Sequence, residues 1–140
     1  MEHGRLQRFV DAQDSGGTYE RALAELRAGR KTSHWMWFVF PQIAGLGRSE
    51  MSRRYAIASA SEARDYLAHP VLGPRLLACA EEMLGHDDIS AEEILGAIDA
   101  VKLRSSMTLF AAVAPEQPVF QRVLDRYFDG APDEETRRRL

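Results

Sequence analysis

The sequence has 140 residues, of which 45% are apolar and 28% charged, and its formal net charge is −3. This length suits one domain with a substantial core. We expect a single domain over residues 1–140, with frayed ends at residues 1–4 and 133–140. The acidic balance excludes a global basic field for nucleic acid, so no nucleic-acid partner is expected.

The sequence contains one cysteine and no long apolar run. A single cysteine excludes an internal disulfide and fits a reducing compartment. No run approaches the ~18 apolar residues of a membrane span, and residues 1–10 lack the apolar segment of a signal peptide. We therefore expect a cytoplasmic protein without membrane contact. Cys79 lies on an amphipathic stretch beside Leu76 and Met83, which predicts a core residue and not a nucleophile.

Apolar residues recur at helical spacing along the whole chain, and no segment alternates with a period of two. Ser59 with Glu62 and Ser90 with Glu93 have the spacing of capping boxes. The predicted fold is all-α, a compact single-domain bundle of seven to nine helices. Helices are expected near residues 5–13, 18–28, 34–40, 59–67, 73–84, 90–95, 97–113 and 118–128. A short segment after Ser49 or Ser52 and a final turn or two after Asp133 are also expected.

Residues 29–49, GRKTSHWMWFVFPQIAGLGRS, form the least ordinary stretch and hold both tryptophans. Its run of six apolar residues must be buried, and Pro41 ends the element. We expect a short buried helix over residues 34–40 with Thr32 or Ser33 as its N-cap. Its N-terminus, flanked by Arg30 and Lys31, suits an anion. The alternative is that the tryptophans only anchor the core and the basic residues are solvated.

The predicted helix over residues 97–113 carries a polar stripe inside an apolar face. Asp99, Lys102 and Ser106 are bracketed by apolar residues, with Ser105 just beyond. The brackets are Ile98, Leu109 and Val113 on one side and Leu103 and Phe110 on the other; Ala100, Arg104, Thr108 and Ala111 fall on the expected solvent side. A lysine there is costly unless it is paired or faces a cleft.

Two interpretations of this stripe remain open. Lys102 either pairs with Asp99 or extends its stem to reach water. Alternatively, Lys102, Ser105 and Ser106 form one wall of a polar pocket in which Asp99 orients the lysine.

The functional hypothesis is that the two stretches face each other across a shared hollow that binds an anionic small molecule. An aromatic wall would suit a nucleotide-like or ADP-ribose-like ligand. His34 is the candidate for catalysis because histidine exchanges protons near neutral pH. The candidate ligand-binding residues are Lys31, His34, Trp35, Trp37, Gln42, Tyr55, Asp99, Lys102, Ser105 and Ser106. The alternative function is a non-catalytic protein-interaction domain with the aromatic block as its core and an unidentified protein partner.

Neither a metal site nor a cofactor site is expected. The four histidines never pair at helical spacing, and HExxH, CxxC, phosphate-loop and GxGxxG motifs are absent. The sequence leaves open whether the protein is an enzyme.

Three strings resemble one bacterial family: GRKTSHWMWFVFPQIAGLGRSEMSRRYAI, EARDYLAHPVLGPRL and DAVKLRSSMTLF. They are similar to the family catalogued as domain of unknown function 1810, and the resemblance covers nearly the whole chain. Some members carry the label "calpastatin", which we regard as a misannotation. The resemblance implies a compact, mainly helical fold and no established activity, so no catalytic residue is carried over.

Overall fold

The computed structural model describes residues 2–140, and Met1 lies outside the described part. Over this range the chain is helical and forms no strand; a single isolated parallel bridge joins Ile43 to Ile57. The all-α fold is therefore confirmed. The elements are α1 (Glu2–Asp14), η1 (Ser15–Gly17), α2 (Thr18–Ala28), α3 (Met36–Val39), α4 (Glu50–Arg54), α5 (Ala60–Ala68), α6 (Leu72–Met83), α7 (Ala91–Leu95), α8 (Ala97–Val113), α9 (Pro118–Phe128) and α10 (Glu134–Arg138).

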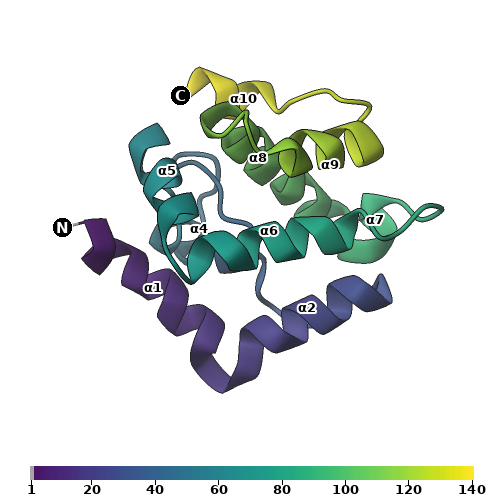
Figure 1. Ribbon diagram of the computed structural model, residues 1–140, viewed down its shortest axis with the longest axis horizontal. Coiled ribbons are helices and arrows are strands. Elements are labelled where there is room, and N and C mark those ends of the chain that lie inside the picture. The colour runs from purple at the N-terminus through teal and green to yellow at the C-terminus, as the bar shows by residue number, and fades with distance from the viewer. Residues whose placement is uncertain (1) are drawn as a thin grey trace.

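Helix α8 is the centre of the bundle. It packs against α5, α7, α9 and α10, while α6 packs against α2, α5 and α9. Helices α1 and α2 form a V below α6, and α8, α9 and α10 lie on the other side of α6 (Figure 1). The segment between α2 and α5, which carries the aromatic block, crosses the molecule behind α6.

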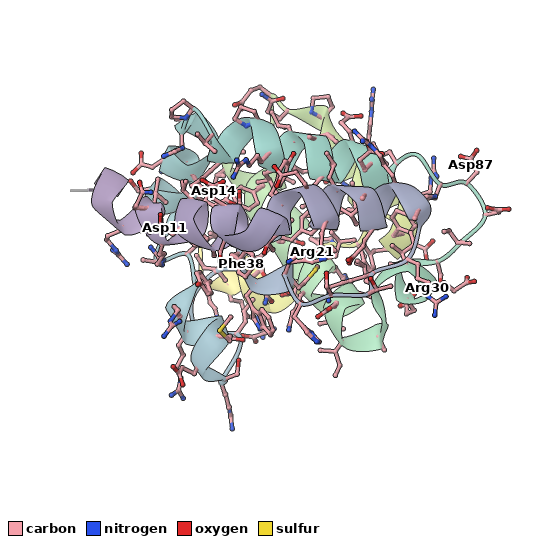
Figure 2. All side chains as sticks on the ribbon, turned by 90° about the horizontal axis from the view of Figure 1, so that it is seen from below. Asp11, Asp14, Arg21, Arg30, Phe38 and Asp87 are labelled. Carbon is pink, nitrogen blue, oxygen red and sulfur yellow. The ribbon has the colours of Figure 1, made fainter. Side chains whose placement is uncertain are left out.

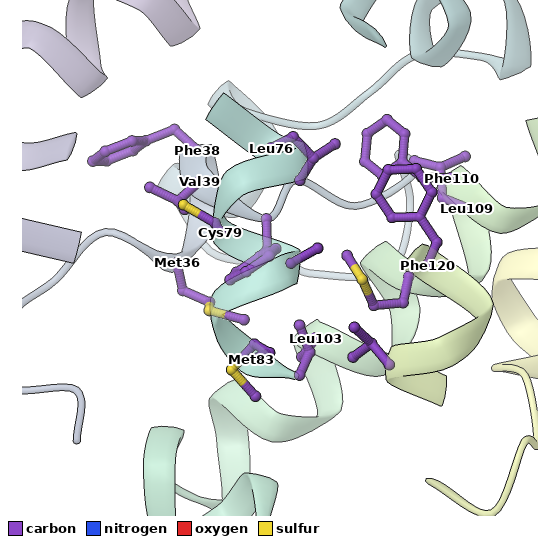
Figure 3. Close-up of a cluster of buried hydrophobic side chains, with 14 of the residues drawn as sticks. Met36, Phe38, Val39, Leu76, Cys79, Met83, Leu103, Leu109, Phe110 and Phe120 are labelled. Atoms are coloured by element: carbon purple, nitrogen blue, oxygen red, sulfur yellow. The ribbon is translucent and has the colours of Figure 1, made fainter. Parts of the chain in front are cut away.

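The core is continuous from the aromatic block to α9. Met36, Phe38 and Val39 lie on the α6 side that carries Cys79, and Phe110 and Phe120 meet at the opposite end (Figure 3). The centroids of those two rings are 5.6 Å apart. Cys79 is buried as expected, and burial raises the pKa of its thiol to about 12, so it is no thiolate at neutral pH.

The prediction of which side of α8 faces solvent was partly wrong. Ala100 and Thr108 are buried, whereas Ile98 is 75% exposed. The reason is a segment distant in sequence: the backbone N–H of Asp133 donates to Thr108 Oγ1 at 2.8 Å, and α10 packs on α8. Every residue of α8 from Ser105 to Phe110 is therefore buried, which the apolar pattern of this one helix does not predict.

The helix in the aromatic block is shorter than predicted. It spans Met36–Val39, a single turn, and its N-cap is Trp35, which makes no side-chain capping bond. The predicted caps Thr32 and Ser33 instead donate hydrogen bonds to Glu25 on α2. This carboxylate holds the preceding residues outside the helix.

The two predicted capping boxes form to different extents. Ser90 and Glu93 form the complete capping box of α7. Ser59 caps α5, but the Glu62 carboxylate accepts from the backbone N–H of Ala58, one residue before the predicted donor. His69 Nδ1 accepts from the N–H groups at the start of α6.

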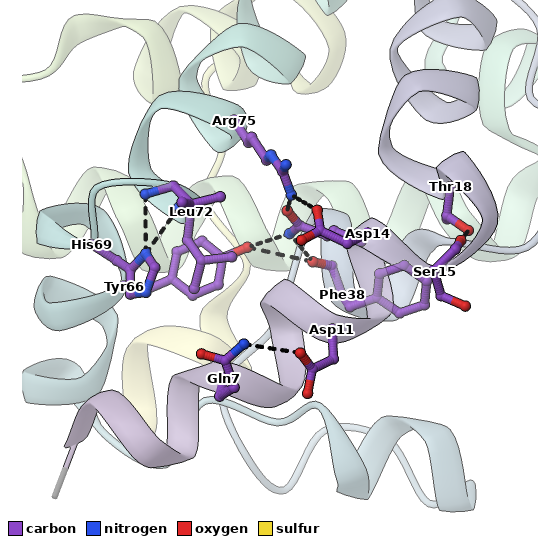
Figure 4. Close-up of polar contacts among 12 residues, drawn as sticks. Gln7, Asp11, Asp14, Ser15, Thr18, Phe38, Tyr66, His69, Leu72 and Arg75 are labelled. Carbon is purple, nitrogen blue, oxygen red and sulfur yellow. Dashed lines mark hydrogen bonds and ion pairs between the residues drawn. The ribbon is translucent and has the colours of Figure 1, made fainter.

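A buried amide at the end of α1 joins this helix to α3, α5 and α6. Gln13 Nε2 donates to the Phe38 carbonyl at 2.8 Å and contacts the Tyr66 hydroxyl at 3.2 Å. Arg75 donates to Gln13 Oε1 and also pairs with Asp14 (Figure 4). Every polar atom of this amide has a partner, as a buried amide requires.

None of the described helices combines the length and the apolar character needed to cross a membrane.

Two glycines provide a matched test of the packing. A Cβ at Gly73 would lie 2.1 Å from the Leu67 carbonyl oxygen, so the start of α6 would have to move away from the end of α5. We expect Gly73→Ala to lower the free energy of unfolding by about 1–3 kcal/mol. A Cβ at Gly4 in α1 would touch nothing, so Gly4→Ala should raise it by up to about 1 kcal/mol. Chemical denaturation measures both, and equal effects would contradict the close approach.

Candidate functional site

The loop between α2 and α3 is held by one carboxylate. Glu25 Oε1 accepts from the backbone N–H groups of Thr32 and Ser33, at 2.9 and 3.1 Å, and from the Trp35 indole at 2.8 Å. Its Oε2 accepts from the Ser33 hydroxyl at 2.6 Å. Helix α2 ends at Gly29, whose φ of 75° is a left-handed conformation that suits glycine, and the loop then folds back over Glu25.

These contacts keep Glu25 ionised. Burial works against the charged form, but hydrogen bonds from Ser33, Thr32 and Trp35 outweigh it and lower the pKa of Glu25 from 4.5 to about 2. The backbone donors that were predicted to receive an external anion beside Arg30 and Lys31 therefore bind the protein's own carboxylate. Arg30 is exposed and lies at the same end of the molecule as Asp87 (Figure 2).

Lys31, in contrast, turns inward. Its backbone N–H donates to the Ile94 carbonyl at 2.7 Å, and its ammonium group lies 2.9 Å from Asp99 Oδ2. Lys102 Nζ approaches the other oxygen, Asp99 Oδ1, at 3.4 Å. The aspartate thus joins the loop to α8, and its predicted pairing with Lys102 is present together with a second partner that the sequence did not indicate.

Each ammonium group also lies over a tryptophan ring. Lys31 Nζ is 5.1 Å from the Trp35 centroid, and Lys102 Nζ is 5.1 Å from the Trp37 centroid. Lysine and indole at such distances attract through the ring quadrupole. We call these five residues the Asp99 cluster; in it Trp35, Lys31, Asp99, Lys102 and Trp37 form one continuous series of contacts.

The cluster carries a net positive charge. Two ammonium groups and one carboxylate give +2 − 1 = +1, and the side chains of Lys31, Asp99 and Lys102 are only 10, 17 and 19% exposed. These are the only two lysines in the sequence; the other 16 of its 18 basic residues are arginines. The compact ammonium group is therefore used at this one place.

An open hollow of about 430 Å³ adjoins the cluster at Lys102. Gln42, Lys102 and Ser105, all predicted ligand-binding residues, line it. Its apolar wall includes Ile98 and Val101, which are 75 and 63% exposed. The remaining lining comes from Leu46 and Gly47, from Ser52 on α4, and from Asp133 and Glu135.

Four other predicted residues do not line this hollow. Trp35 is fully buried, so neither ring face is open to a ligand, and Ser106 is sealed with its hydroxyl unpartnered. The Tyr55 ring packs against Phe9 and Phe38. His34 is exposed and does not line the hollow.

Two signals in the sequence were overlooked. The first is Glu25, a carboxylate that stands shortly before a loop with free backbone N–H groups and before Trp35, whose indole N–H needs an acceptor when buried. The second is that lysine occurs only at positions 31 and 102, whereas every other basic residue is arginine. Within the described residues no group of three metal-ligating side chains occurs.

Comparisons with known proteins place the chain in a family. Residues 3–140 match the family described as "Protein of unknown function (DUF1810)". The chain belongs to the DUF1810 family. A comparison with curated proteins gives no match. Among solved structures, the DUF1810 chain resembles the conserved hypothetical protein Rv1873 from Mycobacterium tuberculosis, with 48% identity and a TM-score of 0.90; the match covers 94% of this chain and 92% of that one.

Replacing Glu25 tests its role in this DUF1810 protein. Glu25→Gln removes the charge and sets an amide NH₂ against N–H donors, so it should lower the free energy of unfolding by about 1–3 kcal/mol at pH 7. Because the folded-state pKa of Glu25 is depressed to about 2, its contribution is present above pH 4.5 and falls as the pH drops from 4.5 towards 2. The difference between wild type and variant should therefore shrink across that interval in urea titrations.

The exposed Glu81 on α6 is the matched control. Glu81→Gln should change stability by less than about 0.5 kcal/mol. A Glu25→Gln effect no larger than this, or one independent of pH, would show that the carboxylate does not hold the loop.

Proposed function

We propose that this protein binds an anionic small molecule in the hollow beside Lys102. The observation that carries the proposal is the convergence of the only two lysines on a single carboxylate at the edge of that hollow. One aspartate neutralises one ammonium group, and Lys31, at the shorter distance, is its closer partner. Lys102 is the group that offers its charge to a ligand.

The surroundings of Lys102 support an anion despite the two acidic residues in the lining. Asp133 Oδ2 already accepts from the Thr136 backbone N–H and hydroxyl. Glu135 pairs with Arg138 at 2.7 Å and with Arg139 at 3.6 Å. These carboxylates are engaged within the C-terminal segment, whereas Lys102 shares its counter-ion.

The lining also indicates the ligand's shape. Ile98 and Val101 offer an apolar surface, and Gln42 and Ser52 offer amide and hydroxyl groups. Ser105 is 3% exposed and its hydroxyl donates to the Val101 carbonyl, so towards a ligand this hydroxyl acts as an acceptor. A volume of about 430 Å³ lies in the ~300–1,000 Å³ range of small-molecule sites. A nucleotide-like or ADP-ribose-like molecule combines a flat apolar part with phosphate, and the proposed ligand is of this kind.

In the site, Lys102 binds the anionic group while Asp99 and Trp37 position its ammonium. Gln42 and Ser105 hydrogen-bond to the ligand, and Lys31 neutralises Asp99. Ser106, Trp35 and Tyr55 support the fold around the site. The proposal includes no catalytic step.

Isothermal titration with ADP-ribose, AMP and ribose 5-phosphate tests this function. Lys102→Met keeps the aliphatic stem and removes the charge, and it should weaken the best ligand about tenfold to a hundredfold. Asp99 keeps Lys31 as a partner in that variant, so folding is preserved. The sealed Ser106→Ala variant is the control and should bind like the wild type.

Failure of the whole panel to bind at millimolar concentration would refute the proposed ligand class. Equal affinity of wild type and Lys102→Met would refute the site.

The exposed Ile98 and Val101 side chains favour one alternative, a protein-interaction surface at the same place. Sedimentation and pull-down experiments with an Ile98→Ser, Val101→Ser double variant separate the two functions. A partner lost in this variant but retained in Lys102→Met would favour the interaction domain.

A further inference from the structure

A second concave surface lies where α1 meets α4 and the residues that follow it. A hollow of about 400 Å³ is lined by Arg5, Arg8, Arg53 and Arg54, and its other lining residues are glycine and alanine. We call it the arginine hollow. The arginine hollow shares no lining residue with the hollow beside Lys102. The hollow that adjoins it shares Gln42, Gly47 and Ser52 with the hollow beside Lys102, but Lys102 itself lines neither of the two basic hollows.

The floor of the arginine hollow is rigidly built. The Arg8 guanidinium donates to the backbone carbonyls of Arg54 and Ala56, both at 2.8 Å, and to that of Arg5. Three carbonyl acceptors fix its orientation, so little side-chain entropy remains to be lost on binding.

A buried carboxylate lies behind this floor. Glu62 is 2% exposed; its Oε2 lies 3.5 Å from Arg5 and its Oε1 lies 3.7 Å from Arg8. Glu62 Oε2 has no hydrogen-bond partner. One carboxylate is thus shared at 3.5 and 3.7 Å between two guanidinium groups. The Arg5 side chain is 55% exposed and has no other partner among the described residues, so it has N–H donors left for an anion.

Arg53 is the unpaired cation of the group. Its guanidinium makes no hydrogen bond or ion pair with any described residue, whereas Arg54 approaches Glu50 at 3.5 Å. Arg53 also lines an adjoining hollow of about 340 Å³, which shares Ala44 and Ala56 with the first and contains Arg48. Arg48 is likewise unpaired among the described side chains.

The charge at this place opposes that of the whole chain. Five arginines, at positions 5, 8, 48, 53 and 54, are set against Glu50 and Glu62, which gives +5 − 2 = +3, while the chain as a whole carries −3. Guanidinium groups bind phosphate oxygens through two parallel N–H donors. Two adjoining hollows with Arg53 between them suit two phosphate groups better than one.

We propose that the arginine hollow and its neighbour form a second binding site, for a small molecule that carries two phosphate groups. Arg5 and Arg8 hold one phosphate, Arg48 holds the other, and Arg53 lies between them. The site binds by charge and by fork-shaped hydrogen bonding, with no chemical step.

Isothermal titration of the full chain with pyrophosphate and with inorganic phosphate tests this site. Pyrophosphate should bind more tightly than phosphate, and its affinity should fall as salt is raised from about 20 to about 200 mM. Arg53→Gln should weaken pyrophosphate about tenfold. Arg53 is exposed and unpaired, so the variant should keep the melting temperature of the wild type.

Two variants serve as controls. Arg122 on α9 is an exposed arginine outside both hollows, and Arg122→Gln should leave pyrophosphate binding unchanged. Lys102→Met should also leave it unchanged, which separates this site from the one proposed above. No pyrophosphate binding at millimolar concentration, an equal loss in Arg122→Gln, or a loss in Lys102→Met would each overturn the assignment. An oligothymidylate that binds more tightly than pyrophosphate through Arg53 would replace the small molecule with a nucleic acid.

Discussion

The Glu25 carboxylate is the constraint on which the rest of the site depends. A loop that leaves a helix after glycine has free backbone donors, and two of them, with a serine hydroxyl and an indole N–H, converge on this one side chain. The contacts fix Trp35 in the core and direct Lys31 inward towards α8. The backbone N–H groups of Arg30 and Lys31 hold the start of the loop through the Glu25 and Ile94 carbonyls, and the Glu25 carboxylate holds residues 32–35.

The contacts of the Asp99 cluster connect the buried loop to the open hollow. Trp35 provides a ring for Lys31, Lys31 reaches Asp99, and Asp99 reaches Lys102 beside Trp37. A buried charge is tolerated when it is paired, and here the pairing leaves one positive charge in excess at the edge of an open hollow. The same contacts therefore stabilise the junction of loop and helix and present a cation to solvent.

Much of the fold could be predicted from local signals. Helix α2 ends at Gly29, α7 begins at its capping box, and α9 begins at Pro118, each where the sequence places it. Local signals fail where distant segments decide burial. The apolar pattern of α8 places Thr108 on the solvent side, but the segment at Asp133 covers it. The predicted N-caps of α3 donate to Glu25 instead and do not cap the helix.

The candidate site shows the same division. The helical wheel places Asp99 beside Lys102, and the aromatic block places two tryptophans near a basic residue, so the meeting of the two stretches could be expected. That Lys31 is the second partner of Asp99, and that Trp35 is sealed while Trp37 is half-buried, depends on how the loop folds back over α2. The arginine hollow joins residues about 48 positions apart, and no sequence motif connects them.

The two tryptophans allow the most direct test of the account, because their indole N–H groups give two separate signals in a ¹⁵N-correlated NMR spectrum, which a Trp37→Phe variant assigns. During titration with ADP-ribose the Trp37 signal should move and saturate, since its ring lies under the Lys102 ammonium. The Trp35 signal should stay nearly fixed by its hydrogen bond to Glu25. Two stationary signals at millimolar ligand, or movement of Trp35 alone, would contradict an anion site at Lys102.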